Sequence, residues 1–307
     1  MSFTTIVKNE ISHIEQTEVT TLAELSAIVS CSSKTDTFLR ISIENASVIR
    51  RIFTLLKETF SIRPKIIVRK GYNYNKNYMY ILEITHNLDK IYDTLGLKNK
   101  LIPELYLLDD EESVRAYIRG VFLMTGSIND PKKSRYHLEF LFTSEEYAQF
   151  FCDLLNRFSL GSKYIKRENK YMVYIKEAEK IGDFLRIIHA ISALLYYEDI
   201  RIYRDHKNMT NRLNNCEQAN VDKIIQTATR QIEDIALIEE VESLDLLDEK
   251  IREVALYRKK YPEVSLLELS EIISYETGVE ITKSGLNHRF KKIKELATKI
   301  RKNKEET

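Results

Sequence analysis

The chain has 307 residues and almost balanced charge, with 47 basic and 46 acidic side chains. Its length allows two or three domains with cores of their own, and the balanced charge gives no overall field that favours nucleic acid. The three cysteines, at positions 31, 152 and 216, lie far apart, which argues against a zinc site and a disulfide framework. No segment approaches the roughly 18 apolar residues of a membrane span, so we expect a soluble cytoplasmic protein without metal or cofactor.

A segment near the N-terminus has a counterpart in the middle of the chain. Residues 23–33 and 116–126 align with small and apolar residues in the same columns. Small residues interrupt the apolar face of each segment, namely Ala27 and Ser30 in the first and Gly120 and Gly126 in the second. Such residues allow two helix backbones to approach closely. The pattern predicts two related helices that pack on each other at a pseudo-twofold axis.

The same order of elements follows each of these helices, as expected of an internal repeat. The first half continues with a strand at 38–43, a helix at 46–60, strands at 64–70 and 77–85, and a short helix at 87–95. The second half continues with a strand at 136–142, a helix at 144–158, strands at 162–167 and 170–175, and a helix at 176–189. Ser144 followed by two glutamates suits a helix start. We predict an α+β domain of two pseudo-symmetric halves, residues 1–97 and 98–205.

Two hairpins in these halves combine basic and aromatic residues. Residues 69–78 include Lys70, and residues 163–171 include Lys166 and Arg167. Basic residues beside aromatic rings suit contact with phosphates and bases. Exposed hairpins are also commonly polar because polarity protects a sheet edge from aggregation. The sequence leaves both interpretations open.

Residues 206–245 are expected to form a helical connector. Before it, residues 200–205 are strand-like, and residues 207–212 have the composition of a loop or helix start. Side chains in this region that suit a secondary nucleic-acid contact are Arg201, Arg204, Arg212 and Asn215. The amides of residues 211–220 suit phosphates, bases or backbone caps equally well. A helix is predicted from Val221, followed by an acidic, solvated stretch at 239–249.

Residues 246–307 are predicted to form an all-α helix-turn-helix domain that binds DNA. Helices are expected at 246–260 and 265–275, the second opened by the capping box Ser265 and Glu268, and a third starts at Thr282 or Ser284. Residues 282–307 contain nine basic and three acidic residues, so the balanced total conceals a basic C-terminal segment.

The third helix of this domain divides into two faces. Leu286, Phe290, Ile293, Leu296 and Ala297 are expected to be buried. Lys283, Ser284, Asn287, His288 and Lys291 lie elsewhere, toward the end that enters the major groove in this motif, and Asn287 suits a bidentate contact with adenine. Arg289 and Lys292 suit backbone phosphates. The alternative is an ordinary basic surface helix in a three-helix bundle.

Residues 118–126 resemble the LAGLIDADG motif of homing endonucleases. Four runs in the same order over almost the full length, at 115–131, 211–220, 230–235 and 284–289, resemble the WhiA family of bacterial sporulation-type regulators. This resemblance implies a duplicated LAGLIDADG-like domain joined to a C-terminal helix-turn-helix. It also implies binding to double-stranded promoter DNA at the nucleoid, in control of cell division or development.

The resemblance bears on catalysis as well. The homing endonucleases hold a divalent metal with an acid at the penultimate motif position, where this chain has Ser32 and Thr125. Because neutral hydroxyls replace a carboxylate pair poorly, we expect a transcription regulator that is not an enzyme. One alternative is a metal-dependent endonuclease that uses Asp36 and Asp130. Another is an interaction protein whose first domain binds an RNA polymerase sigma factor or another regulator.

Overall fold

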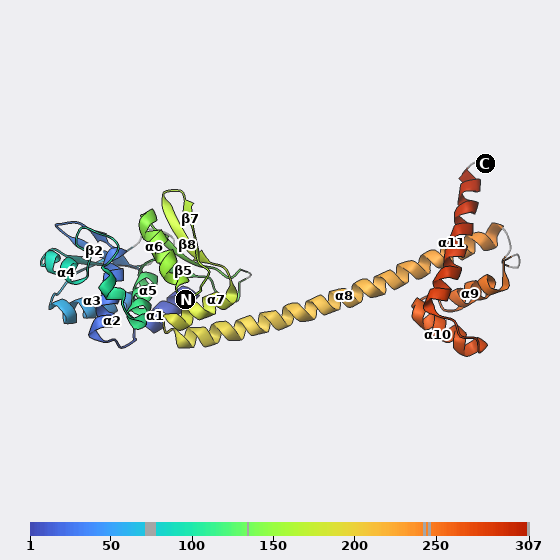
Figure 1. Cartoon of the computed structure of the whole chain (residues 1–307), viewed down its shortest axis with the longest axis horizontal. Helices are drawn as coiled ribbons and strands as arrows, with labels where there is room; N and C mark the ends of the chain where they lie inside the picture. The colour runs from blue at the N-terminus through green and yellow to red at the C-terminus, as the bar shows by residue number, and fades with distance from the viewer. Residues whose placement is uncertain (71–77, 134, 242–243, 245–246, 306–307) are drawn as a thin grey trace. The chain divides into compact units, whose positions relative to one another are not determined.

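The computed structural model describes residues 1–70, 78–133, 135–241, 244 and 247–305. The tip of the first basic hairpin, residues 71–77, lies outside the described residues, as do Glu242 and Asp245 of the acidic stretch. The chain forms two compact units, Met1–Asp205 and His206–Thr307. Figure 1 shows the elements of each unit.

Unit 1 contains the two predicted halves, and each half forms a four-stranded antiparallel sheet. The first half contains α2 (Glu18–Ser30), β1 (Ser33–Lys34), β2 (Leu39–Ile43), α3 (Ala46–Phe60), β3 (Lys65–Lys70), β4 (Tyr78–Ile84) and α4 (Leu88–Thr94). The second contains α5 (Glu111–Thr125), β5 (Gly126–Ile128), β6 (Leu138–Phe142), α6 (Glu145–Asn156), β7 (Lys163–Arg167), β8 (Lys170–Ile175) and α7 (Ala178–Ile187). The strand orders, β1-β2-β4-β3 and β5-β6-β8-β7, are equivalent, which confirms the predicted duplication.

The close contact of α2 with α5 depends on one small residue from each helix. A Cβ atom at Gly120 would lie 2.6 Å from the Glu24 carbonyl oxygen and 2.8 Å from the Ala27 Cβ, so only glycine fits there. This confirms the predicted backbone-to-backbone packing. Gly126, which follows the end of α5, is small for a different reason, because its missing Cβ makes room for the Phe122 ring of that helix.

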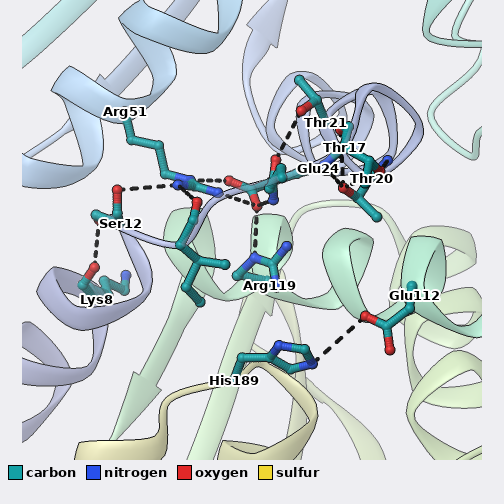
Figure 2. A network of polar contacts seen from close by, with 12 residues as sticks. Lys8, Ser12, Thr17, Thr20, Thr21, Glu24, Arg51, Glu112, Arg119 and His189 are labelled. Carbon is teal, nitrogen blue, oxygen red and sulfur yellow. Dashed lines mark hydrogen bonds and ion pairs between the residues drawn. The ribbon is translucent and has the colours of Figure 1, made fainter.

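A buried ionic network joins three helices of unit 1. The Glu24 carboxylate is completely buried and accepts from Arg51 Nε at 2.6 Å and from Arg119 Nε at 2.8 Å (Figure 2). Burial alone would raise the pKa of the Glu24 carboxyl, but the hydrogen bonds and charges of the two arginines outweigh it and lower the pKa. Gln16 also donates to Glu24, and Arg51 Nη1 donates to the carbonyls of Ser12 and Ile14. The network therefore fixes α2 against α3, α5 and the segment after α1.

Two helices of unit 1 were not predicted. One of them carries a glutamate that caps the long helix at the end of the unit. The two helices are α1 (Phe3–Ile11) and the 3-10 helix η1 (Leu105–Leu108). The Glu10 carboxylate of α1 accepts hydrogen bonds from Ser192 N at 2.6 Å and Ala193 N at 2.9 Å, at the first turn of α8 (Ile191–Val241). A carboxylate at that position satisfies free N–H groups and complements the helix dipole.

The prediction of a strand at 200–205 is wrong, because α8 runs through these residues. Residues 207–212, for which a loop or a helix start was predicted, are helical, but the helix starts earlier, at Ile191. The alternation of Ile200 and Ile202 is too short to decide against a helix, and no glycine or proline interrupts residues 191–241. Burial at helical spacing of Ala193, Leu194 and Tyr197 anchors the first turns of α8 in unit 1. The boundary between the two units falls within this helix, after Asp205.

Unit 2 contains the last part of α8 followed by α9 (Glu249–Lys260), α10 (Leu266–Thr277) and α11 (Lys283–Glu305). The capping box of Ser265 and Glu268 is present at the start of α10, as predicted. The core of unit 2 is formed by apolar side chains of all four helices, among them Ile235, Ile238, Ile251, Val254, Leu269, Ile273, Leu286, Phe290, Ile293 and Ala297. The predicted inner face of α11 is confirmed, with Leu296 partly buried at its margin. Among the described residues, no helix is long and apolar enough to cross a bilayer.

Candidate nucleic-acid interface

The turn between α10 and α11 is fixed by one glycine and two hydroxyls. Gly278 ends α10 with a φ of 69°, a left-handed conformation that glycine adopts without steric cost. The Ser274 hydroxyl oxygen accepts a hydrogen bond from Ile281 N at 2.9 Å, which holds the turn against α10. Thr282 Oγ1 accepts from Gly285 N at 3.1 Å, so Thr282 rather than Ser284 caps α11. Two helices joined by such a short, anchored turn form a helix-turn-helix.

The first turns of α11 present most of the predicted site residues to solvent. The exposed members are Lys283, Ser284, Asn287, His288, Lys291 and Lys292. Within the described part of the chain, none of these six side chains has a hydrogen bond or ion pair with the protein. Lys283 and Ser284 also lie in the first turn of α11, whose free N–H groups carry partial positive charge. The arrangement is suited to an anionic partner such as a phosphate backbone.

Arg289 differs from the other predicted residues. Its Nη1 atom lies 3.7 Å from the Glu253 carboxylate and donates to the Lys250 carbonyl oxygen at 3.5 Å, so the side chain turns toward α9. Only 22% of the side chain is exposed. The Arg289 guanidinium therefore contacts α9 and does not belong to the group of exposed side chains without a partner.

Sequence reasoning missed Arg258, which supports the position of α11. Arg258 is buried, and its Nη1 donates to the carbonyls of Val264 at 2.8 Å and Tyr261 at 3.3 Å. Its guanidinium lies 5.5 Å from the centroid of the Phe290 ring. The Arg258 side chain therefore connects the turn after α9 with the inner face of α11, and burial lowers its pKa. No local pattern separates Arg258 from the neighbouring Lys259 and Lys260, which form surface ion pairs.

The predicted secondary contacts are distributed over α8, β3 and β7. Arg201 pairs with Glu198 at 2.6 Å, and Arg204 donates to the carbonyls of Pro131 and Lys133, so both are used within unit 1. Arg212 and Asn215 are exposed on α8. Lys70 lies at the end of β3 in one sheet, whereas Lys166 and Arg167 are exposed on β7 in the other.

The hydroxyls of Ser32 and Thr125, which were predicted from the sequence to occupy the motif positions of catalytic acids, bond to their own helix turns. Ser32 Oγ donates to the Ile28 carbonyl at 2.6 Å, and Thr125 Oγ1 donates to the Val121 carbonyl at 3.1 Å. The alternative acids Asp36 and Asp130 line two different cavities, so the structure does not bring them together. Among the described residues, no group of three or more His, Cys, Asp and Glu side chains is arranged to hold a metal ion.

Fold and site together define a class of protein, a duplicated LAGLIDADG-like domain followed by a helix-turn-helix unit. Residues 12–98 match the WhiA N-terminal LAGLIDADG-like domain, residues 114–207 the WhiA LAGLIDADG-like domain, and residues 210–297 the WhiA C-terminal HTH domain. The chain therefore belongs to the WhiA family.

Individual relatives agree with this assignment over nearly the full length. The probable cell division protein WhiA of Bacillus cereus (strain G9842) is 42% identical over 313 residues, which cover 98% of each chain. The protein of the same name from Staphylococcus haemolyticus (strain JCSC1435) is 42% identical over 310 residues, again with 98% of each chain covered. Among solved structures, full-length WhiA from Thermatoga maritima is similar with 25% identity and a TM-score of 0.59, covering 97% of this chain and 99% of that one.

Proposed function

We propose that this chain is a transcription regulator without enzymatic activity, which binds double-stranded DNA through the first turns of α11. The observation that carries the proposal is the group of exposed, unpaired donors on one helix terminus: Lys283, Ser284, Asn287, His288, Lys291 and Lys292. A helix-turn-helix places this end of its second helix in the major groove. The names of the relatives, probable cell division proteins, favour genes of cell division as its targets.

Each part of this interface has a separate role. Lys283, Lys291 and Lys292 neutralise backbone phosphates and release counterions, which supplies affinity without sequence preference. The Asn287 amide donates to and accepts from one adenine edge, and this contact supplies preference for a base. The α11 N-terminus adds backbone N–H groups for one phosphate.

The geometry at the LAGLIDADG-like helices supports a function other than nuclease activity. Hydrolysis of a phosphodiester with a hard divalent cation needs carboxylate or other oxygen ligands held close together. Ser32 and Thr125 offer only hydroxyls that already bond to helix carbonyls. Asp36 and Asp130, which line different cavities, are poorly placed to share one metal.

The experiment that tests the proposal compares variants of the full-length chain on genomic DNA fragments across a salt series. Asn287→Ala is expected to reduce discrimination between the preferred site and its single-base variants by about 1–3 kcal/mol at one position. The matched control is Asn208→Ala, which removes an exposed amide from α8. Unchanged sequence preference in Asn287→Ala would show that another surface reads the DNA.

A second candidate function is supported by the outer strands of the two sheets in unit 1. Ile66 and Val68 of β3 are 55% and 53% exposed, and Ile165 of β7 is 44% exposed. Apolar side chains on a sheet edge favour a protein partner, such as an RNA polymerase sigma factor or another regulator. Binding of that partner would survive Asn287→Ala but be lost in Ile66→Lys together with Ile165→Lys.

A further inference from the structure

A cavity of about 720 Å³ lies in unit 1, and Asp130 is among the residues that line it. We call it the α1 cavity, since much of its lining comes from the first residues of the chain. The end of α5 and strands of both sheets form the other walls. Ser42 on β2 and Met79 on β4 come from the first sheet, and Ser127 on β5 comes from the second. Its volume is typical of sites that hold a small organic molecule.

The N-terminal wall of this cavity is held firmly. Thr4 Oγ1 donates to the Ile128 carbonyl at 2.9 Å and accepts from Ile128 N at 2.9 Å, which fixes α1 to the end of β5. Asn45 caps α3 through Ser47 N and Val48 N and donates to the Asn9 side chain at 2.8 Å. The cavity therefore has walls formed by the fold itself and does not depend on a loop closing over it.

Lys8 faces this cavity in an unusual environment. Its Nζ atom lies 5.6 Å from the centroid of the Phe122 ring. Within the described part of the chain, the ammonium has no carboxylate partner and no hydrogen bond. Burial lowers the pKa of Lys8 to about 8, since water stabilises the charged form less there than at the surface. An anion that binds beside a partly buried lysine without a counter-charge therefore stabilises its charged form.

Three further donors line the same cavity without a partner. Ser42, Ser127 and Lys133 are exposed, and none of their side chains forms a hydrogen bond or ion pair with the rest of the described chain. The two carboxylates of the lining are already engaged: Asp130 accepts from Lys132 N at 2.9 Å, and Glu44 has an interaction of its own. Two ammonium groups and two hydroxyls of the lining therefore have no partner among the described residues, and they lie in the same cavity as two carboxylates that have partners.

We propose that the α1 cavity binds a small phosphate monoester, whose terminal oxygens accept hydrogen bonds from Lys8 and from the hydroxyls that share its cavity. A phosphate monoester carries between one and two negative charges at neutral pH and presents three strong acceptor oxygens, which matches two lysines and two hydroxyls. A carboxylate, with one charge and two oxygens, would leave part of this set unused. The proposal does not depend on DNA binding by α11.

Helix α1, which carries Lys8, also contacts the first turns of α8. Lys8 and Glu10 both belong to α1, and the Glu10 carboxylate caps the first turn of α8. The Phe3 ring of α1 packs against Tyr196 and Tyr197 of α8, with centroids 5.8 and 6.2 Å apart. A ligand that changes the packing of α1 would therefore act on the first turns of α8.

The test uses the full-length protein and phenyl phosphate as the probe. Lysine side chains are labelled by reductive ¹³C-methylation, and the Lys8 resonance is assigned by its loss in Lys8→Met. Phenyl phosphate is expected to bind saturably at one site and to move the Lys8 titration midpoint to higher pH, because a bound anion stabilises the ammonium. By calorimetry, Lys8→Met should weaken binding at least about tenfold, the effect of losing one charge-assisted hydrogen bond.

Matched variants separate this site from general charge effects. Lys57→Met removes an exposed lysine from α3 and should leave the affinity for phenyl phosphate unchanged. Ser42→Ala with Ser127→Ala should weaken binding by a smaller factor than Lys8→Met, and this variant serves if Lys8→Met does not fold. The proposal is overturned if phenyl phosphate leaves the Lys8 midpoint unchanged, or if acetate moves it equally. It is also overturned if only duplex DNA moves the midpoint, because Lys8 would then belong to a nucleic-acid surface.

Discussion

The α2–α5 helix pair contains a buried ionic network, whereas the lysines in the first turns of α11 have no partner among the described residues. Glu24 is completely buried and lies between Arg51 and Arg119, whose side chains are 6% and 5% exposed. Lys283, Lys291 and Lys292 are exposed, and within the described residues they have no partner.

This contrast separates charges that stabilise the fold from charges that are available for binding. A buried ion must be paired, since an unpaired ion loses its hydration without compensation. An exposed lysine remains hydrated and keeps its charge available for an anionic partner. Within α11, the Arg301 side chain is 49% exposed but pairs at 2.7 Å with the nearly buried Asp234, whereas the lysines of the first turns have no partner among the described residues. Four substitutions test whether the division is as sharp as the contacts indicate.

The largest effect is expected from Glu24→Ala. It leaves two guanidinium groups buried without their counter-charge, and breaking such a network costs about 3–5 kcal/mol in the free energy of unfolding. Glu83→Ala is the matched control, because its ion pair with Arg40 is at the surface and contributes little. Urea unfolding followed by circular dichroism measures both variants. Equal losses in the two variants would contradict the distinction between buried and exposed pairs.

The same network gives a pH dependence whose sign follows from the lowered pKa of Glu24. The stabilisation is fully present above the unfolded-state pKa, near the ordinary value of 4.5, and is lost as pH falls through the lower pKa of the folded state. Glu24→Gln should therefore flatten the acid side of the stability profile. A profile that keeps the wild-type slope below pH 4.5 would assign the acid sensitivity to other carboxylates.

A smaller effect is expected from Gly120→Ala, which tests the contact on which the helix pair depends. The added Cβ would lie 2.6 Å from a backbone oxygen of α2, so the helices must separate, at a cost of about 1–3 kcal/mol. Gly285→Ala on α11 is the control, since its Cβ would meet nothing closer than 3.5 Å and alanine favours a helix. Thermal unfolding should show a lower midpoint for the first variant and an equal or higher midpoint for the second.

The repeat, its small residues and the helix-turn-helix could all be predicted, because each is recognised from patterns within short segments, which can then be compared along the chain. Capping, periodicity and local small residues decide where a helix begins, which face is buried and where backbones approach. The inner face of α11 follows from spacing alone. The incorrect prediction of a strand at 200–205 shows the limit of such reasoning, because this short alternating pattern lies within an uninterrupted helix of 51 residues.

The partners of individual charges could not be predicted, because they lie far apart along the chain. Glu24 meets Arg51 at a separation of 27 residues and Arg119 at a separation of 95. Arg289 lies on the margin of the inner face of α11, and only the position of Glu253 on α9 decides which way it turns. Arg204 was predicted as a nucleic-acid contact for its charge, whereas its guanidinium donates to backbone carbonyls of the segment after β5.

The smallest effect, and the most specific, is expected from Lys291→Gln compared with Arg289→Gln. If Lys291 contacts a phosphate, its loss should reduce the slope of log K against log salt concentration by about 1 and weaken binding to all sequences equally. Because Arg289 is turned toward Glu253, Arg289→Gln should leave that slope unchanged and lower the thermal midpoint instead. Fluorescence anisotropy with a labelled duplex measures the slope at several salt concentrations. A reduced slope in Arg289→Gln would mean that its ion pair with α9 opens on DNA, and the division of charges within α11 would then describe only the free protein.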